Sequence, residues 1–564
     1  MTRFLLFLPV LLHLISLVQC TAQSLPLPYH SNKKLEVRRG AVVSAHPLAS
    51  QAGLSILRQG GNAIDAAIAT QLALAVVYPG AGNIGGGGFL TAWLNNGSVI
   101  ALDYRETAPA SASRNMYLDS AGNPQLQRSQ NGATAAGVPG TIAGLFASMK
   151  YARLPFRQLI QPAIDLAENG FPLTAAQAAG FNEYQQDFIS LNHSPVAFVK
   201  YVPWKEGDLL VQLNLAATLK RIRDKGAKEF YEGETARMIV AEMEKGRGLI
   251  SMEDLKNYRA KERKAVRFRY RGYEIISAPL PSSGGMLLQQ MMGMVSNYPL
   301  SKMQFQTPES MQLMIEAERR AYADRAAWMG DPDYVKVPVQ PLTNAAYLRK
   351  RISDYTPGRA GNSKTTSSGL TPESSETTHL CVIDAAGNAV SVTTTLNGQF
   401  GSRTVVSGAG FLLNNEMDDF SIKPGVPNMY GAVGNEQNAI APGKRMLSSM
   451  APTIVLKRGR PYLITGTPGG TTIPTTVFQL LTGILDFGLD AEKAVQSPRF
   501  HHQWLPDQVS VEHDFSPTLI EKMEKMGYSV KKRSSIGRAE MIQVRKGRII
   551  AVADRRGDDG AAGY

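Results

Sequence analysis

The most sharply patterned part of the sequence is residues 377–397, TTHLCVIDAAGNAVSVTTTLN. It directly follows a polar and flexible segment, residues 356–376, which reads TPGRAGNSKTTSSGLTPESSE. Within 377–397, apolar and polar residues alternate on both sides of a short break that contains glycine, which is the pattern of a β-hairpin. The sequence therefore predicts a linker that ends where a sharply patterned hairpin begins.

The register of this hairpin can be predicted from its loop. Residues 385–387 (AAG) have the length of a three-residue loop, with Gly in the left-handed position that ends such loops. Asp384 then pairs with Asn388, so the numbers of paired residues sum to 772. Thr377 therefore lies opposite Thr395, at the open end of the hairpin.

Alternation along the two strands also predicts which side chains share a face. One face carries Thr377, His379, Cys381, Ser391, Thr393 and Thr395, and the other carries Leu380, Val382, Val390 and Val392. Two Thr hydroxyls are therefore expected to meet at one end of a half-buried sheet.

A threonine that begins a chain can act as a nucleophile, because its own α-amino group takes the hydroxyl proton. The junction between Glu376 and Thr377 has the form of a cut site that would create such an N-terminus. Thr is also a favoured strand residue, and Ser/Thr-rich stretches are usually linkers. On the hairpin alone, an ordinary strand after a linker is the simpler interpretation.

Several long motifs change this interpretation. After the hairpin come LLNNEMDDFSIKPGVPNMYG, KRMLSSMAPTIV, TGTPGG and a closing AGY, and before it come AHPLASQAGLSILRQGGNAIDAAIAT, NIGGGGFL, LDYRETAPA and GVPGTIAGL. In these motifs and their order, nearly the whole chain resembles γ-glutamyltransferase (γ-glutamyl transpeptidase, glutathione hydrolase) of the bacterial periplasmic type. This family consists of self-cleaving N-terminal nucleophile hydrolases.

The resemblance implies an α+β chain folded as a four-layer αββα sandwich. It also implies a signal peptide at 1–22, a large subunit at 23–376 whose last part (355–376) is a flexible linker, and a small catalytic subunit at 377–564. The implied reaction moves a γ-glutamyl group from glutathione or a related compound, through a γ-glutamyl-threonine intermediate, to water or to an amino acid or peptide amine. The alternative is a related acylase of the cephalosporin or glutaryl type.

The same resemblance assigns the catalytic residues. Thr377 would be both the nucleophile and the residue after the cut, and Thr395 would hold it by a hydrogen bond. Gly469 and Gly470 lie between a strand-like segment (462–466) and a helical pattern from Thr472, and their N–H groups would form the oxyanion hole. Without the resemblance, an ordinary strand-to-helix turn would be the preferred interpretation of this segment.

A γ-glutamyl donor carries an α-carboxylate and an α-ammonium, so its pocket needs both signs of charge. The resemblance assigns the carboxylate to Arg105, Ser448 and Ser449, and Arg105 is the only strong positive group that we assign to the pocket from the sequence. The ammonium is assigned to Asn397, Glu416 and Asp419. The segment 423–434 (KPGVPNMYGAVG) resembles a lid loop, with Tyr430 as its latch. Retention of this loop favours γ-glutamyl chemistry over the acylases.

The remaining composition is that of a large globular protein. The 564 residues are 43% apolar and 19% charged, with a net charge of +13. Scattered positive charge is typical of a solvated face, so we do not expect nucleic-acid binding. The adjacent residues His501 and His502 have no neighbouring ligand spacing, and neither a metal nor another cofactor is expected.

The N-terminus is predicted to be a targeting segment. Arg3 is followed by an apolar run, 4–18, and then by small and polar residues, and the run is too short for a convincing membrane span. Cleavage near residues 20–22 would send the protein to a periplasm or outside the cell. Lipid attachment at Cys20 is the less favoured alternative. After cleavage Cys381 is the only cysteine, so no internal disulfide is expected.

Periodicity predicts further elements along the chain. Helices are expected at 45–77 (two, separated by Gly60-Gly61-Asn62), 209–225, 234–245 and 308–329, and strands at 378–384, 389–395, 410–413, 453–457 and 463–465. Strands therefore concentrate around the hairpin, with helices in flanking blocks.

Overall fold

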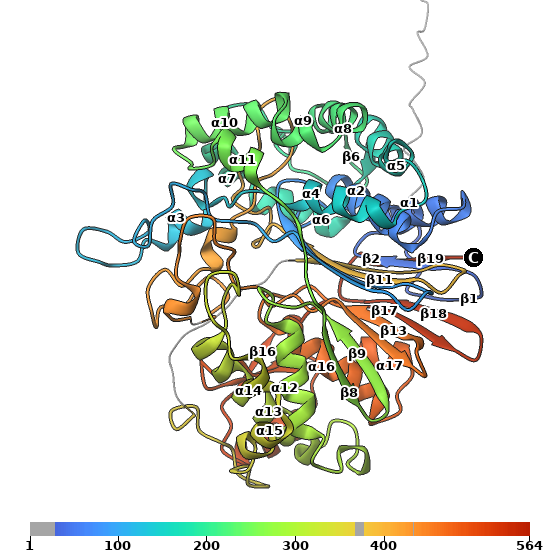
Figure 1. Cartoon of the computed structure of the whole chain (residues 1–564), viewed down its shortest axis with the longest axis vertical. Helices are drawn as coiled ribbons and strands as arrows, with labels where there is room; N and C mark the ends of the chain where they lie inside the picture. The colour runs from blue at the N-terminus through green and yellow to red at the C-terminus, as the bar shows by residue number, and fades with distance from the viewer. Residues whose placement is uncertain (1–28, 367–376, 433) are drawn as a thin grey trace, which may run out of the picture.

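The computed structural model describes residues 29–366, 377–432 and 434–564. A layer of helices, two stacked β-sheets and a second layer of helices follow one another from top to bottom (Figure 1). The predicted α+β fold with four αββα layers is thus confirmed. The predicted signal peptide, Cys20 and Glu376 lie outside the described residues.

The first sheet contains the predicted hairpin at its centre. Its strand order is β19-β2-β10-β11-β3-β4-β7. The strands are β2 (Ala41–Ser44), β3 (Gly87–Trp93), β4 (Val99–Asp103), β7 (Lys261–Glu262), β10 (Thr378–Ile383), β11 (Ala389–Thr395) and β19 (Gly560–Gly563). Thr378 pairs with Thr394 and Ile383 with Ala389, as the predicted register requires. Gly387, with φ +83°, ends the loop in the left-handed conformation.

The expectation of a half-buried sheet is wrong. Every residue of β10 and β11 is buried, on both faces. The second sheet covers the face that carries His379 and Cys381, while helices cover the face that carries Leu380 and Val382. Small polar side chains on the inner face fit because they bond to one another: His379 Nδ1 lies 2.8 Å from Thr393 Oγ1.

The second sheet packs against the first through a thin apolar layer. Its order is β1-β18-β17-β13-β12-β9-β8. The strands are β1 (Lys34–Val37), β8 (Val266–Tyr270), β9 (Tyr273–Ser277), β12 (Thr453–Lys457), β13 (Arg460–Gly466), β17 (Glu540–Arg545) and β18 (Arg548–Ala553). Val43 and Cys381 of the first sheet meet Ile454, Ile464 and Ile542 of the second in this layer.

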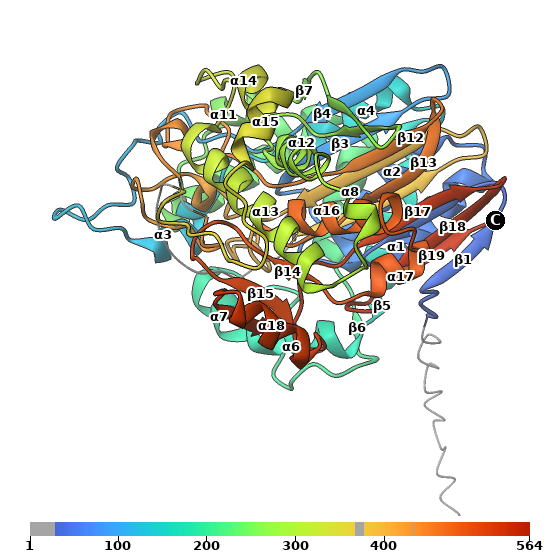
Figure 2. The same cartoon turned by 90° about the horizontal axis from the view of Figure 1, so that it is seen from below.

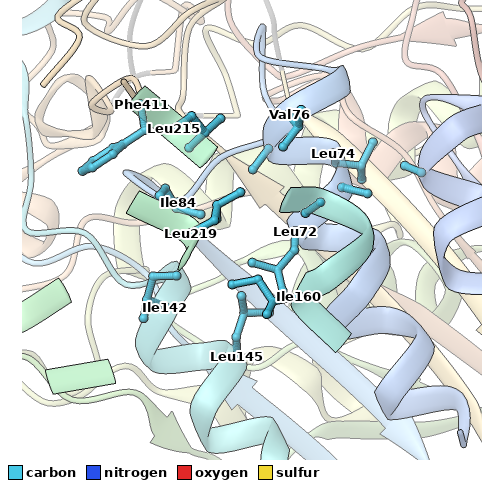
Figure 3. Close-up of a cluster of buried hydrophobic side chains, with 14 of the residues drawn as sticks. Leu72, Leu74, Val76, Ile84, Ile142, Leu145, Ile160, Leu215, Leu219 and Phe411 are labelled. Atoms are coloured by element: carbon cyan, nitrogen blue, oxygen red, sulfur yellow. The ribbon is translucent and has the colours of Figure 1, made fainter. Parts of the chain in front are cut away.

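The upper helices bury the other face of the first sheet. They include α1 (Pro47–Arg58), α2 (Ala63–Val77), α4 (Thr141–Ser148), α5 (Phe156–Asn169), α8 (Leu213–Lys225), α9 (Ala227–Tyr231), α10 (Glu234–Gly246) and α11 (Met252–Asn257), with α6 (Ala175–Glu183) and α7 (Gln185–Leu191) beside them. Leu72, Leu145, Ile160 and Leu219 from four of these helices converge in one core (Figure 3). α2 is buried along its whole length, which explains why most of its residues are apolar.

The lower helices cover the outer face of the second sheet, as the view from below shows (Figure 2). They are α12 (Gly284–Val295), α13 (Pro308–Trp328), α14 (Val339–Thr343), α15 (Ala345–Arg351), α16 (Thr472–Leu485), α17 (Ala491–Gln496) and α18 (Pro517–Lys525). α13 begins as predicted at Pro308, where the Thr307 hydroxyl accepts the N–H of Ser310. α13 also carries buried charged residues. One of them, Arg325, lines the pocket that is described below, together with Arg105.

Short elements complete the described chain. They are α3 (Leu126–Gln130), the pair β5 (Phe171–Pro172) and β6 (Leu209–Leu210), and the small sheet β14 (Phe500–His501), β15 (Val509–Glu512) and β16 (Val530–Arg533). Within residues 29–366, 377–432 and 434–564, we find no helix with both the length and the apolar character needed to cross a bilayer.

Most predicted elements are confirmed, and two need correction. Helix α8 begins at Leu213, because Leu209–Leu210 pairs as strand β6 with Phe171–Pro172. Residues 410–413 form isolated bridges in place of a strand, since Gly410 has a left-handed φ of +77° that breaks an extended run. Strands are also less concentrated around the hairpin than expected, because β2, β3 and β4 come from the N-terminal part of the chain.

Part of the predicted linker is well anchored. In the described portion, 356–366, the N–H of Gly361 donates to Glu316 of α13 at 2.9 Å, and the N–H of Ser363 donates to Asp507 at 2.8 Å. Ser363 is fully buried. The segment is therefore held to the lower helices over its first half, which corrects the expectation of uniform flexibility; residues 367–376 are outside the description.

Candidate active site

The two threonines of the hairpin meet as predicted. Thr377 Oγ1 lies 3.4 Å from Thr395 Oγ1, and both residues are buried. Thr395 Oγ1 also accepts the backbone N–H of Asn397 at 2.8 Å. Because this bond occupies a lone pair of Thr395, its hydroxyl hydrogen can be directed to Thr377.

A glycine-rich backbone packs behind these threonines. A Cβ at Gly86 would lie 2.1 Å from the carbonyl oxygen of Thr395, and one at Gly88 would lie 2.4 Å from that of Thr393. Side chains are excluded at such distances. The run 85–88 therefore lets β3 approach the nucleophile strand closely.

The Gly469-Gly470 turn closes another side of the site. It joins the end of β13 to the start of α16, as the sequence predicted. Gly469 has φ +137° and Gly470 has φ +53°, both in the region that favours glycine. A Cβ at Gly470 would lie 2.7 Å from the ring of Tyr430. Gly470 lines the pocket, while the carbonyl of Gly469 accepts the N–H of Thr472 at 2.9 Å.

Arg105 is buried among three carboxylates. Its Nη1 lies 2.5 Å from Glu416 Oε2 and 3.7 Å from Glu106 Oε2, and its Nη2 lies 2.5 Å from Asp419 Oδ2. Burial alone would lower the pKa of Arg105, but the carboxylates of Glu416, Asp419 and Glu106 raise it overall. Arg105 therefore stays charged.

The carboxylates around Arg105 hold their protons more tightly than usual. Burial raises the pKa of Glu106 to about 7 and that of Glu416 well above its ordinary value, against the opposing effect of Arg105. The pKa of Asp419 is raised by the same cause. Three carboxyl groups around one guanidinium cannot all ionise at low cost, so the cluster retains a proton near neutral pH.

Two serines line the same pocket as Arg105. Ser448 and Ser449 lie just before β12, and the Ser448 hydroxyl accepts the N–H of Met450 at 3.2 Å. Arg325 lines the same pocket, and its Nη2 donates to Ser449 Oγ at 3.2 Å. Arg325 is therefore a second cation of the pocket, one that the sequence did not allow us to assign.

The loop 423–432 covers the pocket through Tyr430. The Tyr430 hydroxyl donates to the carbonyl oxygen of Asn397, and its N–H donates to Asn428 Oδ1 at 2.9 Å. Asn428 Nδ2 in turn donates to Asp419 Oδ1 at 2.8 Å. The free volume of the covered pocket is about 20 Å³, room for about one water molecule. The loop is therefore in a closed position, and a larger ligand requires it to move.

Comparisons with known proteins identify this constellation. The family profile described as gamma-glutamyltranspeptidase matches residues 49–564. The glutathione hydrolase proenzyme of Escherichia coli is 45% identical over 94% of this chain and 93% of its own length. The chain belongs to the gamma-glutamyltranspeptidase family. It is accordingly an enzyme, and the family predicted from the motifs is confirmed.

Solved structures agree with this assignment. The gamma-glutamyltranspeptidase of Helicobacter pylori is 47% identical, with a TM-score of 0.56 over 56% of this chain and 92% of that one. A cephalosporin acylase from Bacillus halodurans has a TM-score of 0.81 over 97% of this chain and 99% of that one, at 28% identity. The acylases thus share the whole fold but are more distant in sequence.

The pocket of this gamma-glutamyltranspeptidase chain brings together most of the predicted site residues. Those that line it are Thr377, Thr395, Asn397, Gly470, Arg105, Glu416, Asp419, Ser448, Ser449 and Tyr430. Gly469 lies next to the pocket without lining it. Sequence reasoning missed Glu106, Arg325, Asn428 and Thr471. Glu106 follows Arg105 directly and Asn428 lies in the lid motif, so the motifs could have drawn attention to both; nothing in the pattern of α13 distinguishes Arg325.

Two other expectations concern metal and cysteine chemistry. Among residues 29–366, 377–432 and 434–564, His, Cys, Asp and Glu side chains form no group of three or more that could hold a metal ion. Cys381 is buried with a free thiol, and Cys20 is not described. Burial raises the pKa of the Cys381 thiol well above its ordinary value, so this residue is an unreactive core residue.

Proposed function

We propose that Thr377 is the nucleophile of a self-cleaving γ-glutamyltransferase that hydrolyses glutathione and related γ-glutamyl amides. The observation that carries this proposal is the meeting of the Thr377 and Thr395 hydroxyls, 3.4 Å apart, beside a pocket that contains groups of both charges. The name of the Escherichia coli relative, a glutathione hydrolase proenzyme, supports the substrate.

Maturation would begin with an attack by Thr377 Oγ on the carbonyl carbon of Glu376. The peptide C–N bond breaks as the C–O bond forms, which gives an ester and frees the α-amino group of Thr377. Water then hydrolyses the ester. The products are a large fragment that ends at Glu376 and a small fragment of 188 residues, 377–564.

In turnover the freed α-amino group would be the base. Thr377 Oγ attacks the γ-carbonyl carbon of the donor while its proton passes to the amino group. The amide C–N bond then breaks, and the leaving amine takes that proton. Water or a second amine attacks the γ-glutamyl ester in the reverse sense and restores the threonine. Thr395 holds the nucleophile throughout.

The oxyanion that forms in each attack needs hydrogen-bond donors. The backbone N–H groups of Gly469 and Gly470 are proposed for this role, since they lie at the start of α16, where N–H groups attract negative charge. Loss of one such donor costs about 3–4 kcal/mol of barrier lowering. The closeness of Gly470 to Tyr430 adds a reason why a side chain is excluded there.

The donor's α-carboxylate would bind Arg105, Ser448 and Ser449, and its α-ammonium would bind Asn397, Glu416 and Asp419. In the structure Arg105 is paired directly with Glu416 and Asp419. A zwitterionic donor carries one group of each sign. Its carboxylate can pair with Arg105 while its ammonium pairs with Glu416 and Asp419, so no buried charge is left unpaired. A glutaryl group has no ammonium for the two acids, which favours γ-glutamyl chemistry over the acylase alternative.

The loop around Tyr430 would act as the lid. The hydrogen bond that the Tyr430 hydroxyl donates to the carbonyl oxygen of Asn397 holds the loop closed. Asn397 is itself among the proposed ammonium ligands. Opening would admit the donor and closure would exclude bulk water from the acyl transfer. The lid is thus coupled to the same residue that recognises the substrate.

The two fragments would stay together as a heterodimer. In the first sheet, β10 and β11 of the small fragment pair with β2 and β3 of the large one. In the second sheet, β12 of the small fragment pairs with β9 of the large one. Separation would break these ladders and expose both sheet interiors. We also propose that residues 1–22 are removed on export, which would place the enzyme in a periplasm or outside the cell.

A turnover assay tests the reaction. The purified protein is incubated with a γ-glutamyl anilide, with and without glycylglycine, and with a glutaryl anilide in parallel. Release of aniline from the γ-glutamyl compound, faster with glycylglycine, is expected. Preferential cleavage of the glutaryl compound would favour the acylase alternative and contradict the proposal.

Sequencing tests the cut. Denaturing electrophoresis of the purified protein should give two bands, and the N-terminus of the smaller one should read Thr-Thr-His-Leu. An active enzyme that remains one chain would refute the self-cleavage mechanism.

A further inference from the structure

Arg325 is a buried cation that forms no ion pair with a carboxylate in the described part of the chain. It is 7% exposed and lies in the last turn of α13. In the described part of the chain, no carboxylate oxygen lies within 4.0 Å of its guanidinium. The neighbouring buried arginines of α13 differ: Arg319 pairs with Glu316 and Asp507, and Arg320 pairs with Glu316 and Asp354. Burial of an unbalanced charge is costly, which indicates that an anionic group of a ligand completes the site.

The contacts of Arg325 place it at the serine side of the pocket. Its Nη2 donates to Ser449 Oγ at 3.2 Å, and its Nε donates to Ser283 Oγ at 3.0 Å. Ser283 Oγ then donates to the carbonyl oxygen of Ser448 at 2.7 Å. One guanidinium therefore supports both serines, Ser449 directly and Ser448 through Ser283. This support joins residues on opposite sides of the proposed cut.

The direction of the hydrogen bond to Ser449 matters for recognition. Arginine only donates hydrogen bonds, so Ser449 Oγ must accept from Arg325 and keeps its own hydrogen for another acceptor. A carboxylate is an acceptor without a donor of its own. With Arg325 in place, the Ser449 hydroxyl is thus set to donate to an anion in the pocket.

Arg105 is poorly suited to hold that anion without help. Its Nη1 lies 2.5 Å from Glu416 and its Nη2 lies 2.5 Å from Asp419, so carboxyl groups already occupy both terminal nitrogens of the guanidinium. A second cation without such partners would strengthen the attraction of the subsite for a carboxylate. The charge of Arg325 reaches this cluster: burial raises the pKa of Asp419, while Arg105 and, more weakly, Arg325 lower it.

We propose that Arg325 is a positioning and specificity residue for the α-carboxylate of the γ-glutamyl donor, which it serves by orienting the Ser449 hydroxyl and by supplying the second positive charge of the subsite. This inference rests on the proposed function, because it takes the donor to be a γ-glutamyl compound. It predicts that loss of Arg325 weakens recognition of the carboxylate and leaves recognition of the rest of the donor nearly unchanged.

The test compares two competitive inhibitors that differ at one group. L-Glutamate has an α-carboxylate, and isoglutamine has a neutral α-amide in its place. Both inhibition constants are measured against a γ-glutamyl anilide for the matured wild type, Arg325→Gln and Arg325→Lys. We expect Arg325→Gln to raise the inhibition constant of glutamate by at least about tenfold and that of isoglutamine by less than about threefold. Arg325→Lys should lie between the wild type and Arg325→Gln, since it keeps the charge without the fork.

A matched control and a double variant separate this role from a structural one. Arg320→Gln removes another buried arginine from α13, outside the pocket, and should leave the ratio of the two inhibition constants unchanged. In a Ser449→Ala background, Arg325→Gln should weaken glutamate binding clearly less than the same substitution does in the wild type, because the hydroxyl that Arg325 orients is gone. Additive effects of the two substitutions would overturn the positioning role.

The outcomes also distinguish this inference from the proposed function. If Arg325→Gln weakens both inhibitors equally, Arg325 is only structural and the inference is wrong, while the proposed function stands. If the wild type does not cleave the γ-glutamyl anilide, the proposed function fails and this inference fails with it. Should Arg325→Gln not mature, the same comparison on Arg325→Lys decides, because a loss of glutamate selectivity there supports the inference and its full retention overturns it.

Discussion

The nucleophile end of the hairpin and the charged pocket lie side by side, yet the chain assembles them in different ways. Thr377 and Thr395 are 18 residues apart and meet through the register of one hairpin. Arg105 and Asp419 are 314 residues apart, and Arg325 and Ser449 are 124 apart. The first region depends on a local pairing pattern, whereas the second depends on how four layers pack.

This difference separates chemistry from recognition. At its nucleophile end the hairpin carries threonines, and strand pairing fixes two hydroxyls there, so its function should depend on a few atoms. The pocket is a network of arginines and carboxylates in which each charge is tuned by the others, so single changes should shift affinity and pH dependence by degrees.

Removal of the Thr377 hydroxyl should abolish both self-cleavage and turnover, because the same oxygen is proposed for each attack. Thr377→Ser should keep part of both, since the hydroxyl remains while the methyl group that positions it is lost. Electrophoresis and the γ-glutamyl anilide assay measure the two effects. Thr378→Val is the control: Thr378 Oγ1 has no hydrogen-bond partner in the described chain, and the variant should mature normally. An Ala variant at 377 that still cut itself would show the assignment to be wrong.

Substitution of Arg105 should affect recognition and leave self-cleavage intact, because that step involves no donor. Arg105→Lys keeps a charge near Glu416 and Asp419 but loses the two-point fork, so kcat/KM for a γ-glutamyl donor should fall by about 10- to 100-fold. Arg105→Ala should lose more, about 2–5 kcal/mol, since it also leaves the acids unpaired. Arg548→Lys, at an exposed pair, is the control. An unchanged kcat/KM in the Ala variant would remove Arg105 from the site.

Glu106 should make stability depend on pH. Burial, the largest cause, raises its pKa from 4.5 to about 7. A carboxyl group with a raised folded-state pKa contributes stability below its unfolded pKa, and this contribution is lost as the pH rises through the folded value. Glu106→Gln removes this titrating group. The free energy of unfolding of the variant minus that of the wild type should therefore rise by about 1–3 kcal/mol from about pH 5 to about pH 8.

Urea unfolding at the two pH values measures this difference. Glu521→Gln, which replaces an exposed glutamate, serves as the control and should show no such change. A difference between Glu106→Gln and the wild type that stays constant with pH would mean that Glu106 does not titrate in this range.

The smallest effect is expected at the lid. Tyr430→Phe removes the hydrogen bond to the carbonyl of Asn397 and keeps the ring that packs on Gly470. One such bond is worth about 0.5–1.5 kcal/mol, so KM for the donor should rise by about 2- to 12-fold while self-cleavage is unchanged. Tyr334→Phe, whose exposed hydroxyl donates to Pro442, is the control. Steady-state kinetics would contradict the lid role if both variants behaved alike.

Local rules predicted the parts of the fold that depend on neighbouring residues. The hairpin register followed from Gly387 and strict alternation, the break between α1 and α2 followed from Gly60-Gly61-Asn62, and α13 begins at Pro308 as predicted. The strand predicted at 410–413 is wrong, because the sequence pattern does not reveal the left-handed φ of Gly410. The strands β8 and β9 were missed. They pair with each other, and β9 also pairs with β12, which lies far along the chain, so much of their stability comes from a distant partner.

The nucleophile hairpin, the family and most residues of the candidate site follow from the sequence, because they depend on local periodicity and on ordered motifs. The packing of the layers adds three features: both faces of the hairpin are buried, Arg105 lies among three carboxylates, and Arg325 of α13 supports Ser449. Burial and charge pairing depend on segments more than a hundred residues apart, and no pattern within one segment specifies which distant groups will meet it.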